Sequence, residues 1–576
     1  MGYKVGVSSG LYSVARPEEL STTVRKLGYA LTRGTSTIEI AADVPNEVTE
    51  TEGVEIRGLS EKQGVEILLH GSLTVPMGIP ERGEWRDAQD HINKSIRSAV
   101  FAGAKYVNFH SCLNIWLELM TYAGRKLTMS FCDHDGRFIS NILKENPKLR
   151  KWFIKNKKIY IHDIMTPEDE NLISANQEQI RSRFEADLAA IENRMRPIGG
   201  NPPEITPDEG AKLLEERRRK YADDREQIYD NFLEDKLSQG KRWDSEELRA
   251  SEGVLDGYMI MGHHMFYTKD PVWMSMAEIY KDVLDVYKID YSDDTWLYEA
   301  WRKAETDNDR KFKEFFYAAI AAKYLEGHMK FALKFIDEEL VKKEFAGQPK
   351  LREIAEKMRI TIECPDARDP SHGGLHLLWS PRQIYAAVKS IRNTLNSKKI
   401  WMLMDYEHVA TQGVDPIKDM KETIKLAPDF GSYTASIHAN APNPLQPHNP
   451  LEMGDVRVYA LLYMLRKTGF GKNQDVYLIF ERGGAQDPFQ QSVEVLRLMV
   501  NYLEQDCPPK ELPPEFFGVK GATAGDIRRQ SQIITEHAYE PLKDLLEMPE
   551  EEWTMLSQAA IKKGKRPEQW KKEEYK

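Results

Sequence analysis

The feature that most constrains the fold is an alternation of short apolar runs with helix-like segments, which occurs in two blocks. The first block holds four apolar runs typical of strands, at residues 3–9, 36–43, 64–70 and 105–110. The second block holds four more, at residues 359–364, 400–405, 433–438 and 475–481. Strands that alternate with helices form parallel sheets, and eight such units predict an α/β fold, the (β/α)₈ or TIM barrel.

A highly charged segment without strand patterns separates the two blocks. Its helix-like stretches are joined by the breaker sequence "RPIGGNPPEITPDEG". We therefore expect four parts, which are the first half of the barrel at 1–130, a mainly α-helical insertion after the fourth strand at 131–354, the second half at 355–510 and a helical C-terminal extension at 511–576. An insertion that follows a strand leaves from the face where barrel enzymes have their active sites. It could form a lid, a substrate platform or the contact of a homo-oligomer.

Composition and sequence motifs indicate the compartment and the partners of the protein. The 576 residues are 41% hydrophobic, which is ample for a packed core, and the formal net charge is −11. The sequence shows no bilayer-spanning apolar stretch, no signal-peptide layout at its start and no CxxC pair among its four cysteines. We expect a reduced, cytoplasmic protein without a membrane partner. The net charge does not indicate nucleic-acid binding, although a local basic patch could still provide it.

Side chains that can bind metal ions stand at the ends of six of the eight predicted strands. They are His70, His110, Glu363, Asp405, His438 and Glu481, and two more histidines, His408 and His448, follow strand ends. One polar residue at a strand end is common. Six such residues at the face where barrel enzymes have their active sites are not expected by chance. Carboxylates and imidazoles crowded in one cleft need cations to compensate them, and this mixture of donors suits zinc, manganese or iron.

The segments around these residues resemble those of a known family. The segments "LLHGSL", "VNFHSC", "ITIECPDA", "MDYEHVATQG", "SIHANA" and "LIFERGG" follow the order found in the xylose isomerase-like TIM barrels. They are most similar to the endonuclease IV branch, AP endonuclease family 2, over roughly residues 1–125 and 355–505. The resemblance implies a metal-dependent hydrolase, namely a DNA-repair nuclease that cleaves phosphodiester bonds at abasic or damaged sites. DNA is the favoured substrate, and RNA stays open.

The resemblance also implies two or three divalent metal ions, with zinc favoured and manganese or magnesium as alternatives. The ligands of the first ion would be His70, His110 and Glu363. The ligands of the second would be the shared Glu363 with Asp405, His438 and Glu481. The third ion would take His408 and His448 with an acidic residue, but this chain has Gln446 at that position. Glu363 and Glu481 are the expected catalytic residues.

Two features bear on the third ion and on nucleic-acid binding. Asp455 could complete the third site in place of Gln446, and Leu73 stands where the family has an aromatic residue that enters the duplex. Basic and aromatic residues alternate at "PKLRKWFIKNKK", where candidates for nucleic-acid contact are Lys151, Trp152 and Lys155. A solvated amphipathic helix is the alternative interpretation of this stretch.

A second function is compatible with part of the same residues. Sugar and sugar-phosphate isomerases or epimerases of this superfamily use a set like Glu363, Asp405, His438 and Glu481 around one manganese or magnesium ion. In such enzymes the two glutamates bind the ion and move protons on the sugar. The additional histidines favour the nuclease, and the isomerase remains the alternative.

Overall fold

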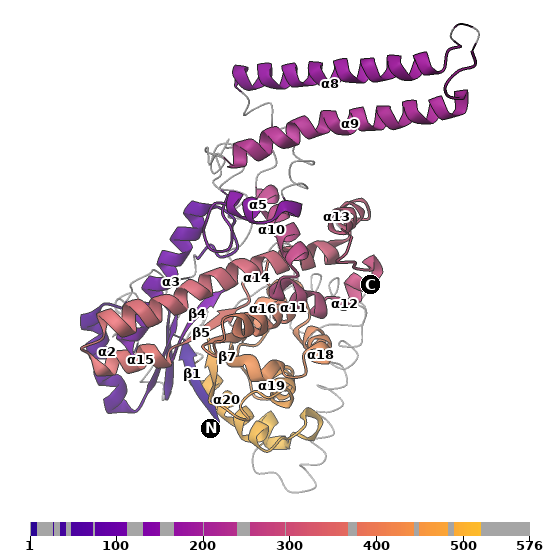
Figure 1. Cartoon of the computed structure of the whole chain (residues 1–576). Helices are drawn as coiled ribbons and strands as arrows, with labels where there is room; N and C mark the ends of the chain where they lie inside the picture. Colours follow the sequence, from indigo (N-terminus) through magenta and orange to yellow (C-terminus); the bar gives the residue numbers. More distant parts are fainter. Residues whose placement is uncertain are drawn as a thin grey trace, which may run out of the picture. The chain divides into compact units, whose positions relative to one another are not determined.

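Eight parallel strands close into a barrel in the computed structural model (Figure 1). The model describes residues 2–8, 27, 35–41, 48–72, 75–111, 131–149, 166–197, 199, 201–238, 254–293, 295–366, 377–442, 449–481 and 489–519. The strands follow one another in chain order, and the first pairs with the last. They are β1 (Tyr3–Ser8), β2 (Thr37–Ala41), β3 (Glu66–His70), β4 (Tyr106–His110), β5 (Arg359–Glu363), β6 (Ile400–Asp405), β7 (Thr434–His438) and β8 (Val476–Phe480). The predicted (β/α)₈ barrel is confirmed.

The strand register brings the carboxyl ends of neighbouring strands to the same level. His110 lies beside Glu363 across β4 and β5, and Asp405 lies beside His438 across β6 and β7. The pairing register between β6 and β7 shifts between Met402 and Leu403, ahead of this second pair. Because parallel strands of a barrel all point the same way, their terminal side chains meet at one face.

Helices pack around the strands of the barrel. They include α2 (Glu50–Gln63), α3 (Arg82–Ala102), α15 (Pro349–Lys357), α16 (Pro381–Thr394), α17 (Tyr406–Thr411), α18 (Pro416–Leu426), α19 (Val456–Lys467) and α20 (Phe489–Glu504). The side chains of Ile384, Val388 and Ile391 are buried on one face of α16, which packs on β5 and β6. At the start of this helix, Oε1 of Gln383 accepts the backbone nitrogen of Ser380 at 3.0 Å.

The chain divides into two compact units, of which the smaller comprises residues 80–83 and 126–268. This unit contains α5 (Ser140–Glu145), α8 (Pro167–Arg194), α9 (Pro207–Ser238) and α10 (Val254–Thr268). Helices α8 and α9 lie side by side as a long hairpin (Figure 1), and Phe184 stacks on Tyr221 between them. Both helices begin with charged, mostly exposed turns, as the highly charged sequence of the insertion predicts.

Residues 269–354, which the sequence analysis assigns to the insertion, group with the barrel in the structure. They form α11 (Pro271–Ile279), α12 (Lys281–Tyr287), α13 (Trp296–Thr306), α14 (Arg310–Lys334) and the π-helix η2 (Phe335–Glu344). Helix α14 packs against α11 and α16, and its Phe315 contacts Trp273 of α11 edge to face. These helices are therefore part of the body that carries the strands.

Two short 3₁₀ turns, η5 (Pro509–Glu511) and η6 (Pro514–Phe517), follow α20. The remainder of the predicted helical extension, residues 520–576, lies outside the described residues. None of the helices described here combines the length and the apolar character that a transmembrane segment needs.

Candidate metal centre

Seven of the eight predicted metal ligands lie together at the carboxyl end of the barrel. Five of them end strands β3 to β7, Glu481 directly follows β8, and His408 lies in α17. The side chains of Glu363, Asp405 and His438 are fully buried, whereas His110 and Glu481 are 19% and 16% exposed. The eighth residue, His448, lies outside the described residues. The centre is therefore deep, with two members that solvent reaches.

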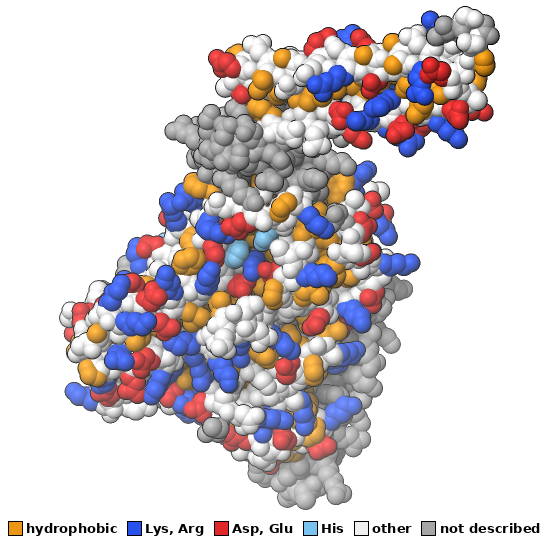
Figure 2. All heavy atoms as spheres, in the orientation of Figure 1, with side chains coloured by type: hydrophobic (Ala, Val, Ile, Leu, Met, Phe, Trp, Pro, Cys, Tyr) orange, Lys and Arg blue, Asp and Glu red, His pale blue; other side chains and the backbone are white. Residues whose placement is uncertain are grey.

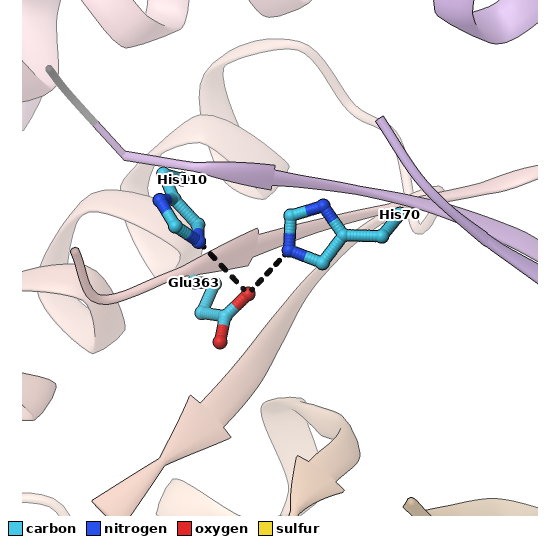
Figure 3. Close-up of side chains that lie close together, drawn as sticks. All are labelled: His70, His110 and Glu363. Carbon is cyan, nitrogen blue, oxygen red and sulfur yellow. Dashed lines mark hydrogen bonds and ion pairs between the residues drawn. The ribbon is translucent and has the colours of Figure 1, made fainter. Parts of the chain in front are cut away.

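Glu363 stands in the middle of the group, and its two carboxylate oxygens face different partners. Its Oε2 is 3.2 Å from Nε2 of His70 and 3.6 Å from Nε2 of His110, and both rings point toward it (Figure 3). Its Oε1 is 3.0 Å from Nδ1 of His438 and 3.4 Å from Nδ1 of His408. One carboxylate thus lies between two sets of nitrogen donors.

Three overlapping groups of ligand atoms are close enough to hold a metal ion. They are His70 with His110 and Glu363, Glu363 with Asp405 and His438, and Asp405 with His408 and Glu481. Within each group the ligand atoms lie within 4.8 Å of one another. The groups share members, since Glu363 belongs to the first two and Asp405 to the last two. Such sharing is what a cluster of ions bridged by carboxylates requires.

Hydrogen bonds orient three of the histidine rings. Nδ1 of His70 is 3.0 Å from the carbonyl oxygen of Gly71, and Nδ1 of His408 is 2.9 Å from that of Cys364. A carbonyl oxygen only accepts, so both Nδ1 atoms donate and each Nε2 faces the carboxylates. His438 is oriented the other way round, because its Nε2 is 3.0 Å from Oε1 of Glu39 and its Nδ1 faces the centre. Histidines that bind metals are held in this manner.

The geometry around His438 fits a cation. Its Nδ1 lies 3.0, 3.2 and 3.6 Å from oxygens of Glu363, Glu481 and Asp405. Yet among the described residues Nδ1 makes no hydrogen bond, and neither does Oε1 of Glu363 or Oδ2 of Asp405, although all three atoms are buried. Each buried polar atom left without a partner costs about 1–3 kcal/mol. A cation bound among these atoms would satisfy them together.

In the described part of the chain, the side chains that carry a permanent positive charge do not neutralise the innermost carboxylates, Glu363 and Asp405. Within the described ranges, the ion pairs of Glu363 and Asp405 are formed with histidines, and no lysine or arginine pairs with either. Buried carboxylates repel one another unless something positive lies between them. The donor set therefore fits a divalent metal ion, and imidazole with carboxylate is a combination that zinc and manganese accept.

The ionisation of the histidines follows from burial and from these carboxylates. Burial alone would lower the pKa of His70, but the hydrogen bond and charge of Glu363 raise it to about 9. Burial opposes the charged form of His408 too, and Asp405 with Glu363 raises its pKa to about 10. Burial lowers the pKa of His110 to about 3. In the metal-free protein His70 and His408 thus hold protons at neutral pH, and an incoming cation releases them.

Two polar residues that support the centre lie inside their strands and not at the strand ends. Asn108 in β4 donates from Nδ2 to Oε2 of Glu363, and its own Oδ1 accepts from Thr361 at 2.8 Å. Glu39 in β2 is fully buried beside His438. Each is a polar residue inside an apolar run, Asn108 in "YVNFH" and Glu39 in "TIEIA". That exception to the pattern was the signal available in the sequence.

The remaining predicted residues are not brought into the centre by the described structure. Gln446, Leu73 and the basic segment with its candidates Lys151, Trp152 and Lys155 lie outside the described residues, so the third ion and the nucleic-acid contact stay predictions. Asp455 is described and belongs to none of the three ligand groups. Its Oδ2 accepts from the backbone nitrogen of Glu452 at 2.8 Å, and burial raises its pKa to about 6.

Comparisons with known proteins add little to this geometry. No family model and no curated protein matches the chain. Three solved structures similar to it are a D-tagatose 3-epimerase-like protein, the D-psicose 3-epimerase of Clostridium cellulolyticum H10 with D-tagatose, and an L-ribulose 3-epimerase. They share 10%, 7% and 8% identity at TM-scores of 0.34, 0.32 and 0.34. The matches cover 87%, 93% and 90% of this chain and 98%, 98% and 100% of theirs.

Identities and TM-scores this low carry no conclusion about activity. The barrel itself rests on the closed strand pairing. The endonuclease IV branch, which the strand-end segments resemble, is not shown by these comparisons.

Proposed function

We propose that this chain is a metal-dependent enzyme of the xylose isomerase-like superfamily that hydrolyses phosphodiester bonds at a centre of two divalent cations. The observation that carries the proposal is the position of Glu363. Its two oxygens face two separate ligand groups, one with His70 and His110 and one with Asp405 and His438. A single ion would need only one of these groups.

The residues of the centre have different roles in such a reaction. Two cations, when bound, lower the pKa of an attacking water and offset the charge of the phosphate and the leaving oxygen. Glu363 bridges the two ligand groups and fixes their spacing. Glu481 is the most exposed carboxylate among the predicted ligands, with 16% of its side chain accessible, and is therefore placed to accept the proton of the water. His110, with 19% of its side chain accessible, is the other predicted ligand that solvent reaches.

The substrate proposed here is an abasic or otherwise distorted nucleic acid, with DNA favoured over RNA. This choice rests on the resemblance of the strand-end segments to endonuclease IV. The net charge is −11, and acidic and basic side chains are interspersed on the face drawn in Figure 2. Because such a surface attracts a phosphate backbone only weakly, we expect weak binding to intact duplex, falling steeply with salt.

One observation favours a second candidate, the isomerisation or epimerisation of a sugar or sugar phosphate at one ion. Nδ1 of His438 is within 3.6 Å of oxygens from Glu363, Asp405 and Glu481, so these four residues also form a single ligand set. Two glutamates in such a set could exchange protons with a bound sugar. In this reaction His70 and His110 would not hold an ion.

An activity panel with one variant separates the two candidates. End-labelled abasic duplex, single-stranded DNA, RNA and a set of ketoses and their phosphates are offered with zinc or manganese. We expect cleavage of the abasic duplex, and a loss of about 10³-fold in His110→Asn, because that variant lacks a ligand of the first ion. His91→Asn is the matched control, since His91 belongs to none of the ligand groups.

The opposite pattern would favour the sugar reaction. Turnover of a ketose with every nucleic acid left intact would contradict the phosphodiesterase. The case for the second candidate would be complete if His110→Asn kept that turnover, because a one-ion reaction does not need the ligand group of His70 and His110.

A further inference from the structure

Glu39 is a buried carboxylate that belongs to none of the three ligand groups. It lies in β2, between β1 and β3, and its side chain reaches the barrel interior. Its Oε1 is 3.0 Å from Nε2 of His438. Its Oε2 accepts the hydroxyl of Tyr106 at 2.5 Å, and the same hydroxyl lies 3.2 Å from Oγ of Ser436. Three strands that are not all neighbours, β2, β4 and β7, thus meet at one carboxylate.

The contacts of Glu39 determine which of the atoms around it donate hydrogen bonds. A carboxylate buried this deeply must be hydrogen-bonded, and an ionised one only accepts. Among the described residues its hydrogen bonds come from Tyr106 and His438. Nε2 of His438 therefore donates to Glu39. A neutral ring that carries its proton on Nε2 presents a lone pair at Nδ1, and this atom faces Glu363, Asp405 and Glu481.

We propose that Glu39 is a positioning residue for the second ion, because it fixes the tautomer and the ring orientation of His438. The inference rests on the proposed metal centre and adds a residue that binds no ion itself. Tyr106 in turn holds the Glu39 carboxylate, so the chain of contacts runs from Tyr106 through Glu39 to His438. Carboxylates behind metal-binding histidines commonly contribute 10- to 100-fold, or about 1–3 kcal/mol, to metal affinity.

The test measures zinc affinity in metal-free protein titrated against a chromophoric chelator. Glu39→Gln keeps the size of the side chain, but its amide can also donate and no longer fixes the tautomer. We expect the variant to bind one ion as the unaltered protein does and the other about 10- to 100-fold more weakly. Tyr106→Phe should weaken the same ion less, because the Glu39 carboxylate stays.

Glu66→Gln is the matched control for this change. Glu66 lies on β3, and its carboxylate accepts the hydroxyl of Tyr477 at 3.2 Å and the Nζ of Lys4 at 2.5 Å, so it pairs with a tyrosine but with no metal-binding histidine. The control should bind both ions with unchanged affinity. Equal weakening in Glu66→Gln and Glu39→Gln would mean a general effect on the barrel and would overturn the assignment.

The outcomes separate this inference from the proposed function. If Glu39→Gln binds both ions as tightly as the unaltered protein, Glu39 is not a positioning residue, while the two-ion centre stands. If the unaltered protein binds no ion, both proposals fail. Should Glu39→Gln not fold, nitrogen-15 NMR of the zinc-loaded, histidine-labelled protein decides, with His438 assigned by the loss of its signal in His438→Gln. A proton on Nε2 supports the inference, and a proton on Nδ1 overturns it.

Discussion

At the scale of single residues, Glu363 is the carboxylate shared by the ligand group of His70 and His110 and the ligand group of Asp405 and His438. It is fully buried, and both of its oxygens are in contact with histidines. Asn108 donates to the same Oε2 that faces His70, which limits rotation of the carboxylate. Glu481, by contrast, contacts His438 from one side and is partly exposed. Removing the charge of these two residues should therefore have different consequences.

We expect Glu363→Gln to abolish the binding of both ions and to lower activity by about 10³-fold, equivalent to about 4 kcal/mol, because a neutral amide does not bridge two cations. Glu481→Gln should weaken one ion and leave the ion of His70 and His110 in place. Elemental analysis and circular dichroism of both variants check this. Unfolding of Glu363→Gln, or loss of both ions from Glu481→Gln, would contradict the shared role.

Asp455 offers a test that depends on pH. Burial raises the pKa of this carboxyl to about 6 in the folded protein, above the value of 3.8 expected in the unfolded chain. A raised carboxyl pKa disfavours the folded state once the group ionises, so its cost grows between about pH 4 and pH 6 and persists above. We expect Asp455→Asn to raise the free energy of unfolding by about 1–3 kcal/mol at pH 7 and to change it little at pH 4.

Denaturant unfolding of the metal-free protein at the two pH values measures this difference. The same variant should keep its metal content, because Asp455 belongs to none of the ligand groups. Loss of an ion would show instead that Asp455 is a ligand, as a third site completed by Asp455 would require.

At the scale of elements, the start of α17 explains why Asp405 and His408 are three residues apart. Oδ1 of Asp405 accepts the backbone nitrogens of Glu407 at 2.7 Å and His408 at 3.1 Å, and so caps the helix. Oδ2 is left to face the centre. The first turn of the helix then brings His408 back over the end of β6. One side chain ends a strand, begins a helix and supplies a ligand.

Two substitutions at Asp405 separate capping from metal binding. Both Asp405→Asn and Asp405→Ala remove the charge and should lose an ion. Asparagine caps a helix about as well as aspartate, whereas alanine does not, so the alanine variant should be less stable than the asparagine variant by about 1 kcal/mol. Denaturant unfolding of the metal-free proteins measures this difference. Equal stability of the two variants would mean that the cap contributes nothing measurable.

At the scale of the whole molecule, the predictable part of the site is the part that depends on strand direction alone. His110 and Glu363 are 253 positions apart in the chain, yet parallel strands of a barrel must end at one face, and the register places them side by side. The same reasoning predicts that Asp405 and His438 lie at that face as well. The ring of candidate ligands could therefore be derived from apolar runs and their last residues.

Other features depend on packing between elements that no local pattern identifies. Glu39 meets His438 across the barrel, from β2 to β7, and only the closed structure shows that two inward-facing side chains touch. Likewise, the apolar residues of α14 indicate burial but not its partners, so the sequence does not reveal that α14 packs on α16 and joins the barrel unit.

The central claim is that Glu363 bridges two cations, and anomalous diffraction from crystals of the zinc-loaded protein tests it most directly. Two strong peaks should appear about 3.5–4 Å apart, the spacing of two-ion sites. One should lie among His70, His110 and Glu363 and the other among Glu363, Asp405 and His438. A single peak bound by Glu363, Asp405, His438 and Glu481, with none beside His110, would contradict the account and favour a one-ion sugar enzyme.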